Sequence, residues 1–167
     1  LLHHLLKHEE AVMTLIFCKT KATVDRLTLF LNRKNIEAAA IHGDLPQNKR
    51  NAVMQQLREG KLSVLIASDL ASRGIDVENI THVINYDVPE DPEIYVHRIG
   101  RTARAGRGGV AWMFVTPEQG QLLTQIETLT NVEIPIKEYP NFKPGSVPEK
   151  ISRQQQADEK RIADVRE

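Results

Sequence analysis

Residues 63–68 read Ser-Val-Leu-Ile-Ala-Ser, a run that is apolar without interruption between its two serines. A strand with one buried face alternates apolar and polar residues, whereas a strand covered on both faces is apolar throughout. The polar stretch 69–79 follows at once. The run is therefore predicted to be an interior strand of a sheet that helices cover on both sides.

Four further segments rich in apolar residues are each predicted to be a strand. They lie at residues 12–18, 37–41, 81–86 and 110–115. Helical patterns or polar stretches separate them, as expected when a crossover helix returns the chain to the start of the next parallel strand. The alternation predicts an α/β fold, with a parallel sheet and helices on both faces.

Helical periodicity fills the gaps after the first two strands. The stretch 22–34 is predicted to bury one apolar face, made by Val24, Leu27, Phe30 and Leu31. The stretch 46–59 has Pro46 near its first turn, ends at Gly60 and directs inward Val53 and Leu57.

A third helix is predicted after the last strand. Residues 116–119 (Thr-Pro-Glu-Gln) form a capping-box pattern with proline at the first helical position. The helix that they open has four apolar residues, Leu122, Leu123, Ile126 and Leu129.

The domain is predicted to span residues 1–140, and residues 141–167 are predicted to be a linker and tail. Prolines punctuate the stretch 135–148. The segment 149–167 is highly charged and almost free of large apolar residues, so it is either a solvated helix or disordered. No function is assigned to it.

Composition excludes several classes of protein. The chain has 167 residues, and its 22 basic residues balance its 22 acidic residues. The single cysteine, Cys18, excludes an intrachain disulfide and a zinc cluster, and its apolar surroundings predict a buried structural thiol. No apolar stretch approaches the roughly 18 residues of a membrane span, and no signal-peptide pattern opens the chain. We expect a cytoplasmic protein without a membrane partner.

The segment 95–109 is the most distinctive in the chain. Arginines recur three residues apart, at positions 98, 101, 104 and 107, so a helix or turn can project several guanidiniums in related directions. Guanidiniums match phosphate oxygens, and glycines at 100, 106, 108 and 109 suit a backbone that turns beside a ligand. The same spacing also fits a basic surface turn. Two apolar members are expected to point inward, Val96 and Ile99.

Two other segments lie where ligands gather in parallel sheets, outside the carboxyl ends of strands. In 68–76, Ser68 suits a phosphate contact and Asp76 suits a hydroxyl donor, although turn and capping chemistry would account for both. The other segment is a turn before a predicted helix, made by His42, Gly43 and Asp44. The first turn of that helix carries Gln47 and Arg50, and the backbone N–H groups at its N-terminus could attract phosphate. A histidine such as His42 more often has a structural role.

A phosphate-binding loop of the form GxxxxGK[ST] is absent, because Gly60-Lys61 is followed by leucine and lacks the upstream glycine. The chain thus has arginines suited to bind phosphate but no phosphate-binding loop. This combination is expected of one domain of a site that two domains share.

Four segments together resemble the DEAD-box RNA helicases of superfamily 2. Residues 97–104 (His-Arg-Ile-Gly-Arg-Thr-Ala-Arg) resemble their motif VI, residues 68–76 their motif V and residues 15–21 their motif IV. Gln47 and Arg50 fit the glutamine–x–x–arginine element. Ala103 and Ser68 depart from the family, which most often has glycine and threonine there.

The resemblance implies a RecA-like C-terminal lobe of an ATP-dependent RNA helicase. Its N-terminal lobe would carry the missing loop and most of the site for ATP with Mg²⁺, so this lobe alone is expected to be inactive. Arg101 and Arg104 would be arginine fingers at the γ-phosphate. Asp76 would accept a hydrogen bond from the ribose of ATP, and Gly74 would line the nucleotide. His97 would couple the two lobes.

The resemblance also implies a track for the RNA backbone, made by Lys19, Thr20, Gly43, Arg50, Ser68, Arg73 and Gly74. Contacts to phosphate and sugar make such binding blind to sequence. ATP-driven local unwinding of RNA duplexes would follow, with room for protein regulators. Two alternatives stay open: a lobe of a superfamily 2 DNA helicase, and a docking platform for a regulator.

Overall fold

A computed structural model of the chain describes residues 1–72, 75, 79–103, 108–139, 141–143 and 145. Four residues with predicted roles lie outside the described residues: Arg73, Gly74, Asp76 and Arg104. The charged tail predicted for 149–167 also lies outside them, so its structure stays a prediction.

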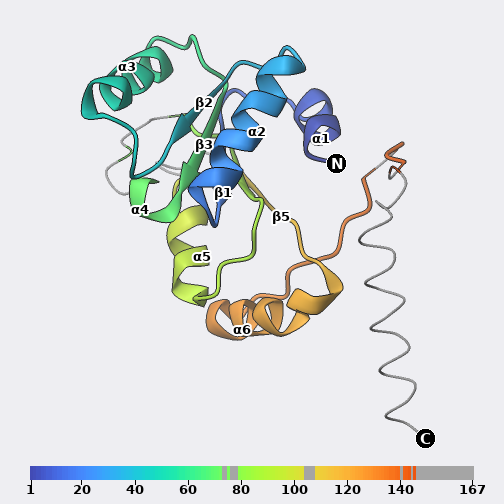
Figure 1. The fold of residues 1–167 in the computed structure, drawn as a ribbon. Helices are drawn as coiled ribbons and strands as arrows, with labels where there is room; N and C mark the ends of the chain where they lie inside the picture. The colour runs from blue at the N-terminus through green and yellow to red at the C-terminus, as the bar shows by residue number, and fades with distance from the viewer. Residues whose placement is uncertain (73–74, 76–78, 104–107, 140, 144, 146–167) are drawn as a thin grey trace, which may run out of the picture.

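The centre of the fold is a sheet of five parallel strands in the order β2-β3-β1-β4-β5 (Figure 1). The strands are β1 (Thr14–Cys18), β2 (Ala38–Ile41), β3 (Val64–Ser68), β4 (His82–Asn85) and β5 (Val110–Met113). The helices are α1 (Leu2–His8), α2 (Lys21–Arg33), α3 (Gln47–Arg58), α4 (Asp69–Ser72), α5 (Pro92–Ile99) and α6 (Gly120–Thr130). All five predicted strands are present, each shorter than predicted by one or two residues.

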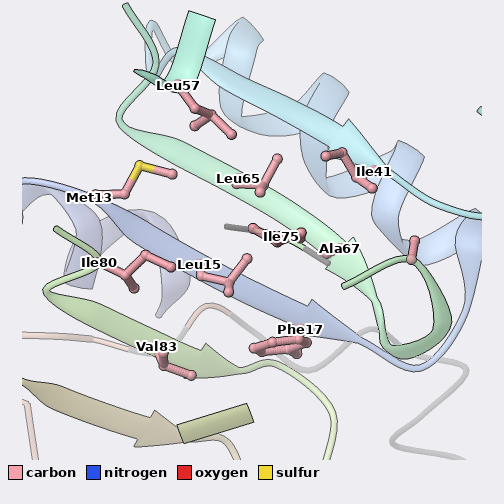
Figure 2. Packing of buried hydrophobic residues seen from close by; sticks show 11 residues of the cluster. Met13, Leu15, Phe17, Ile41, Leu57, Leu65, Ala67, Ile75, Ile80 and Val83 are labelled. Atoms are coloured by element: carbon pink, nitrogen blue, oxygen red, sulfur yellow. The ribbon is translucent and has the colours of Figure 1, made fainter. Parts of the chain in front are cut away.

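The two faces of the sheet are covered by different helices, as the sequence predicted. Successive residues of a strand point to opposite faces. Leu15 and Phe17 of β1 therefore join a core that includes Leu57 of α3, which Figure 2 shows from close by. Ile16 and Cys18 join a second core with α1 and α2. All five residues of β1 are buried, which explains why four of them, Leu15 to Cys18, are apolar.

The strand β5 departs from the prediction of a core strand. Val110 and Ala111 are exposed, because β5 is at the edge of the sheet and has β4 as its one neighbour. A third, smaller core lies between α5 and α6 (Figure 1), and joins Val88 and Tyr95 to the fully buried Ile126.

Two predictions of inward side chains were wrong. Phe30 is 42% exposed, since it lies about 80° round the helix from the centre of the stripe that Leu27 and Leu31 define. Val96 is also exposed, at 43%, because α5 buries Tyr95 and Arg98 instead.

The predicted helix ends were mostly confirmed. Thr116 and Gln119 form the capping box, with the Thr116 amide donating to Gln119 Oε1 at 3.0 Å. The turn Pro117–Gln119 is a 3₁₀ helix, so the α-helix begins only at Gly120. Gly60 follows α3 with φ of +68°, a backbone conformation in which a residue with Cβ is strained.

The helix α1 was not predicted. It buries Leu2 and Leu5 against the α2 side of the sheet. The segment after α6 returns to it, and Tyr139 Oη donates to Glu9 Oε1 at 3.0 Å across 130 residues of sequence. The rings of His4 and Tyr139 meet edge to face at 5.3 Å. In the part of the chain that the structure describes, no helix is long and apolar enough to cross a membrane.

Cys18 is predicted to resist thiol reagents in the folded protein. Burial, reinforced by the charge of Asp87, raises the pKa of the thiol to about 12. At pH 8 the reactive thiolate is therefore about 10⁻⁴ of the total. A chromogenic disulfide reagent should label native protein negligibly and label guanidinium-unfolded protein with one equivalent. Rapid labelling of the native protein would contradict this burial.

Candidate functional site

The strand register brings the predicted site residues to one edge of the sheet. Cys18 at the end of β1 pairs with Ser68 at the end of β3, and Ile41 at the end of β2 pairs with Ala67. Lys19 and His42 each follow directly after one of these strand ends. Because the strands are parallel, the polar residues after them share the carboxyl edge, as the sequence predicted.

Lys19 and Lys21 are held at this edge by carboxylates from other loops. The Lys19 amide donates to Asp87 Oδ2 at 2.8 Å, and its ammonium contacts Glu90 Oε1 at 2.5 Å. Lys21 forms an ion pair with Asp44. These hydrogen bonds raise the pKa of both lysines and lower the pKa of Glu90 and Asp44. The contacts connect three loops that are far apart in sequence.

Thr20 and Gly43 lie beside these lysines. The Thr20 hydroxyl caps α2 by accepting from the Thr23 amide at 3.1 Å, so at least part of its role is structural. Gly43 is exposed, and a Cβ added there would meet no atom within 4 Å. Packing within the lobe therefore gives no reason for glycine at this position. His42, next to it, pairs with Asp25 at 3.1 Å.

Arg50 anchors the segment that follows β3. Its Nη2 atom donates to the Ala71 carbonyl of α4 at 2.8 Å, and its side chain is partly buried. The guanidinium is predicted to face an RNA phosphate, which stays a prediction, and at least one of its donors contacts the protein. Arg50 therefore has, at least in part, a structural role.

Arg98 is the most enclosed charge in this region, at 3% exposed. Its Nε and Nη2 atoms donate to both oxygens of Asp69, at 2.7 and 2.8 Å. Nη1 donates to Asn85 Oδ1 at 3.0 Å and to the Asp87 carbonyl at 2.8 Å. The guanidinium lies 5.2 Å from the ring centroid of Phe17. The sequence grouped Arg98 with arginines directed at a ligand, and the structure corrects this, because its donors are used inside the lobe.

Arg101 has a different environment, although it lies only three residues later. Among the described residues it donates one long hydrogen bond, from Nη1 to the Ile75 carbonyl at 3.4 Å. Thr102 beside it is buried and donates to the Ile80 carbonyl at 2.7 Å. His97, about 100° round α5 from Arg98, is exposed. Arg101 and His97 thus retain donors that can face another molecule.

The backbone between the predicted arginine fingers is constrained. Ala103 has φ of +55°, where a residue with Cβ costs roughly 1–2 kcal/mol relative to a relaxed conformation. Gly109 passes so close to this turn that a Cβ would lie 2.2 Å from Thr102 Oγ1 and 2.7 Å from the Ala103 nitrogen. The glycine is therefore required by close packing of two backbone segments.

Sequence reasoning missed the acidic and amide partners at this edge. These partners end or follow β4, and they contact Lys19 after β1 and Arg98 in α5; they are Asn85, Asp87 and Glu90. A buried polar residue at the end of an apolar strand was the available signal. The described residues hold no group of three or more His, Cys, Asp or Glu side chains arranged for a metal ion.

Comparisons with known proteins identify the family. The family described as helicase conserved C-terminal domain matches residues 1–106. The chain is 37% identical to E. coli DEAD-box protein SrmB in its complex with regulator of ribonuclease activity A, with a TM-score of 0.75, over 87% of this chain and 88% of that one. The chain belongs to the DEAD-box helicase C-terminal domains.

Two further relatives match this helicase C-terminal domain. The DEAD-box ATP-dependent RNA helicase CshA of Bacillus cereus is 47% identical over 129 residues, which are 77% of the chain and 25% of that protein. The chain thus spans about a quarter of the length of this curated relative. S. cerevisiae Dbp5 bound to RNA and ADP BeF3 is 36% identical with a TM-score of 0.68, over 76% of this chain and 34% of that one.

Replacing Gly109 by alanine is predicted to lower the stability of the helicase C-terminal domain by about 2 kcal/mol, since the added carbon overlaps Thr102 and the Ala103 backbone. Gly108→Ala is the matched control, because a Cβ there meets nothing within 4 Å. It should change the free energy of unfolding by no more than about 0.5 kcal/mol. Urea denaturation measures both. Equal effects of the two substitutions would contradict the close approach.

Replacing Arg98 by methionine is predicted to lower stability by about 2–4 kcal/mol. The substitution removes the hydrogen bonds that Arg98 donates to Asp69 and Asn85. The expected loss of stability is moderated because the Asp69 side chain is 32% exposed. Arg58→Met is the control, since Arg58 is exposed at the end of α3 and should change stability by less than about 0.5 kcal/mol. Chemical denaturation compares them, and similar losses would disprove the structural role.

Proposed function

We propose that this domain is the C-terminal lobe of an ATP-dependent RNA helicase and supplies arginine fingers and part of an RNA-backbone track. The observation that carries the proposal is the contrast between two neighbouring arginines. Arg98 donates its hydrogen bonds to groups inside the domain, whereas Arg101 makes one long hydrogen bond among the described residues. A guanidinium that is positioned but not saturated suits a phosphate supplied from elsewhere.

The residues fit a nucleotide that is held mainly by another lobe. ATP with Mg²⁺ would supply the phosphoryl group that is transferred to water. Arg101, with Arg104, would stabilise the negative charge that develops at the γ-phosphate, a contribution of about 10³–10⁵ in rate for fingers of this kind. Asp76 and Gly74 would line the nucleotide, and the exposed His97 would couple the two lobes.

The carboxyl edge of the sheet would carry the RNA backbone. Lys19 contributes positive charge there, the α2 N-terminus beside Thr20 favours phosphate, and Gly43 permits close approach of a strand. Ser68, Arg50, Arg73 and Gly74 complete the proposed track. Contacts of this kind read phosphate and sugar, so binding is expected to be independent of base sequence.

The proposed cycle uses the rigidity of the lobe. ATP and RNA together would close this lobe against an N-terminal lobe, and the closed cleft would bend one strand out of duplex geometry. Hydrolysis and phosphate release would then reopen the cleft. We further propose that residues 1–140 form the moving lobe and that 141–167 form a linker and tail.

Docking of a protein regulator is a second candidate role, compatible with the first. The favouring observation is the complex of the similar SrmB domain with regulator of ribonuclease activity A. This role would not depend on Arg101 or Arg104, which separates the two proposals experimentally.

The arginine fingers are tested by RNA-stimulated ATPase activity. In the full-length protein, Arg101→Ala and Arg104→Ala should each reduce the turnover rate at least about 10³-fold, because each removes charge stabilisation from the transition state. Binding of RNA should change much less. The domain alone should hydrolyse no ATP.

Arg58→Ala is the control for the ATPase measurement, since Arg58 is an exposed arginine at the end of α3. It should retain normal turnover. Each variant should also unfold at the normal denaturant concentration. Normal turnover in the Arg101 and Arg104 variants would overturn the finger assignment and favour the docking role.

A further inference from the structure

Lys19 belongs to the proposed RNA track, and Lys21 lies two residues further along the chain; each forms an ion pair with a carboxylate of the same chain. Lys19 Nζ contacts Glu90 Oε1 at 2.5 Å, and Lys21 Nζ is paired with Asp44 Oδ2. Glu90 comes from the loop before α5, and Asp44 comes from the turn after β2. Each carboxylate therefore reaches the track from a different side.

These ion pairs contribute little to the stability of the fold. The side chains of Lys19 and Glu90 are 61% and 74% exposed, and those of Lys21 and Asp44 are 62% and 61% exposed. Exposed pairs are screened by water and salt, and many contribute nothing measurable. The turn that bears the lysines is fixed by other contacts, namely the Lys19 amide on Asp87 and the Thr20 cap on α2. Stability thus gives no reason for placing two acids at this edge.

We propose that Glu90 and Asp44 compete with the RNA backbone for Lys19 and Lys21, and so set the affinity and salt dependence of RNA binding. The inference rests on the proposed RNA-binding function and goes beyond it. A phosphate that approaches either lysine meets a carboxylate already in place. Binding must break the ion pair and leave the displaced carboxylate near the RNA.

The competition has a measurable electrostatic signature. A lysine that neutralises a phosphate of single-stranded nucleic acid releases about 0.7 of a condensed cation, which makes affinity fall as salt rises. A carboxylate freed in the same step takes up a cation from solution. The two effects offset each other, so a paired lysine adds less than an unpaired one to the slope of log K against log salt concentration.

The test measures binding of the full-length protein to a single-stranded RNA of uniform sequence at several salt concentrations. Glu90→Gln and Asp44→Asn remove the competing charges while keeping the shapes of the side chains. Each should tighten binding about two- to fivefold at low salt, through lost repulsion and a freed lysine. Each should also make the slope steeper by up to about 0.7, and the double variant should show the sum.

Glu59→Gln is the matched control, because it changes net charge by the same amount. Glu59 pairs with Lys61 at 2.7 Å, and both lie before β3, at the opposite end of that strand from Ser68. The control should leave affinity and slope unchanged. A second control, Lys19→Met combined with Glu90→Gln, should not gain the steeper slope, since the freed lysine is gone.

The outcomes separate this inference from the proposed function. If the unsubstituted protein binds RNA and all three single variants behave alike, the competition is disproved while the RNA track stands. If the unsubstituted protein binds no RNA in the presence of a non-hydrolysable ATP analogue, the track itself is wrong, and the competition falls with it. Tighter, more salt-sensitive binding in the Glu90 and Asp44 variants alone supports the inference.

Discussion

The buried guanidinium of Arg98 is the interaction on which the rest of the site depends. A charge removed from water must have its hydrogen bonds completed, and the donors of Arg98 are met by Asp69, Asn85 and the Asp87 carbonyl. These partners come from α4, from the end of β4 and from the loop after it. One side chain of α5 therefore sets the position of that helix against the sheet, and with it the place of Arg101 and His97.

Burial also distinguishes two parts of the site: polar groups whose hydrogen bonds are completed inside the domain, and exposed charges that can bind another molecule. Around Arg98 and Thr102, polar groups are buried and bonded, so geometry there is rigid. At Lys19 and Lys21, the ammonium groups are exposed and pair, within the described part of the chain, with carboxylates that are exposed too, so they exchange partners readily. A binding surface built in this way combines fixed backbone positions with replaceable side-chain contacts.

The sequence predicted the sheet well because a short, unbroken apolar run between polar stretches is typical of a strand buried on both faces. It could not predict which arginine of the series at 98, 101, 104 and 107 is buried, since spacing says nothing about the carboxylate of Asp69, 29 residues away. Glu90 was missed for the same reason, as its partner Lys19 is 71 residues distant. Phe30 was misplaced because its angular position, and not its apolar character, decides its exposure. The predicted fingers and RNA contacts remain predictions.

The contact between Tyr139 and Glu9 has a consequence for cooperativity. It joins the first helix to the segment after the last helix, across nearly the full length of the described fold. Such a contact closes a very long loop, so it forms only when the sheet between its ends is already assembled. The two ends should therefore fray together as one unit, and hydrogen exchange in α1 should follow exchange in residues 134–139.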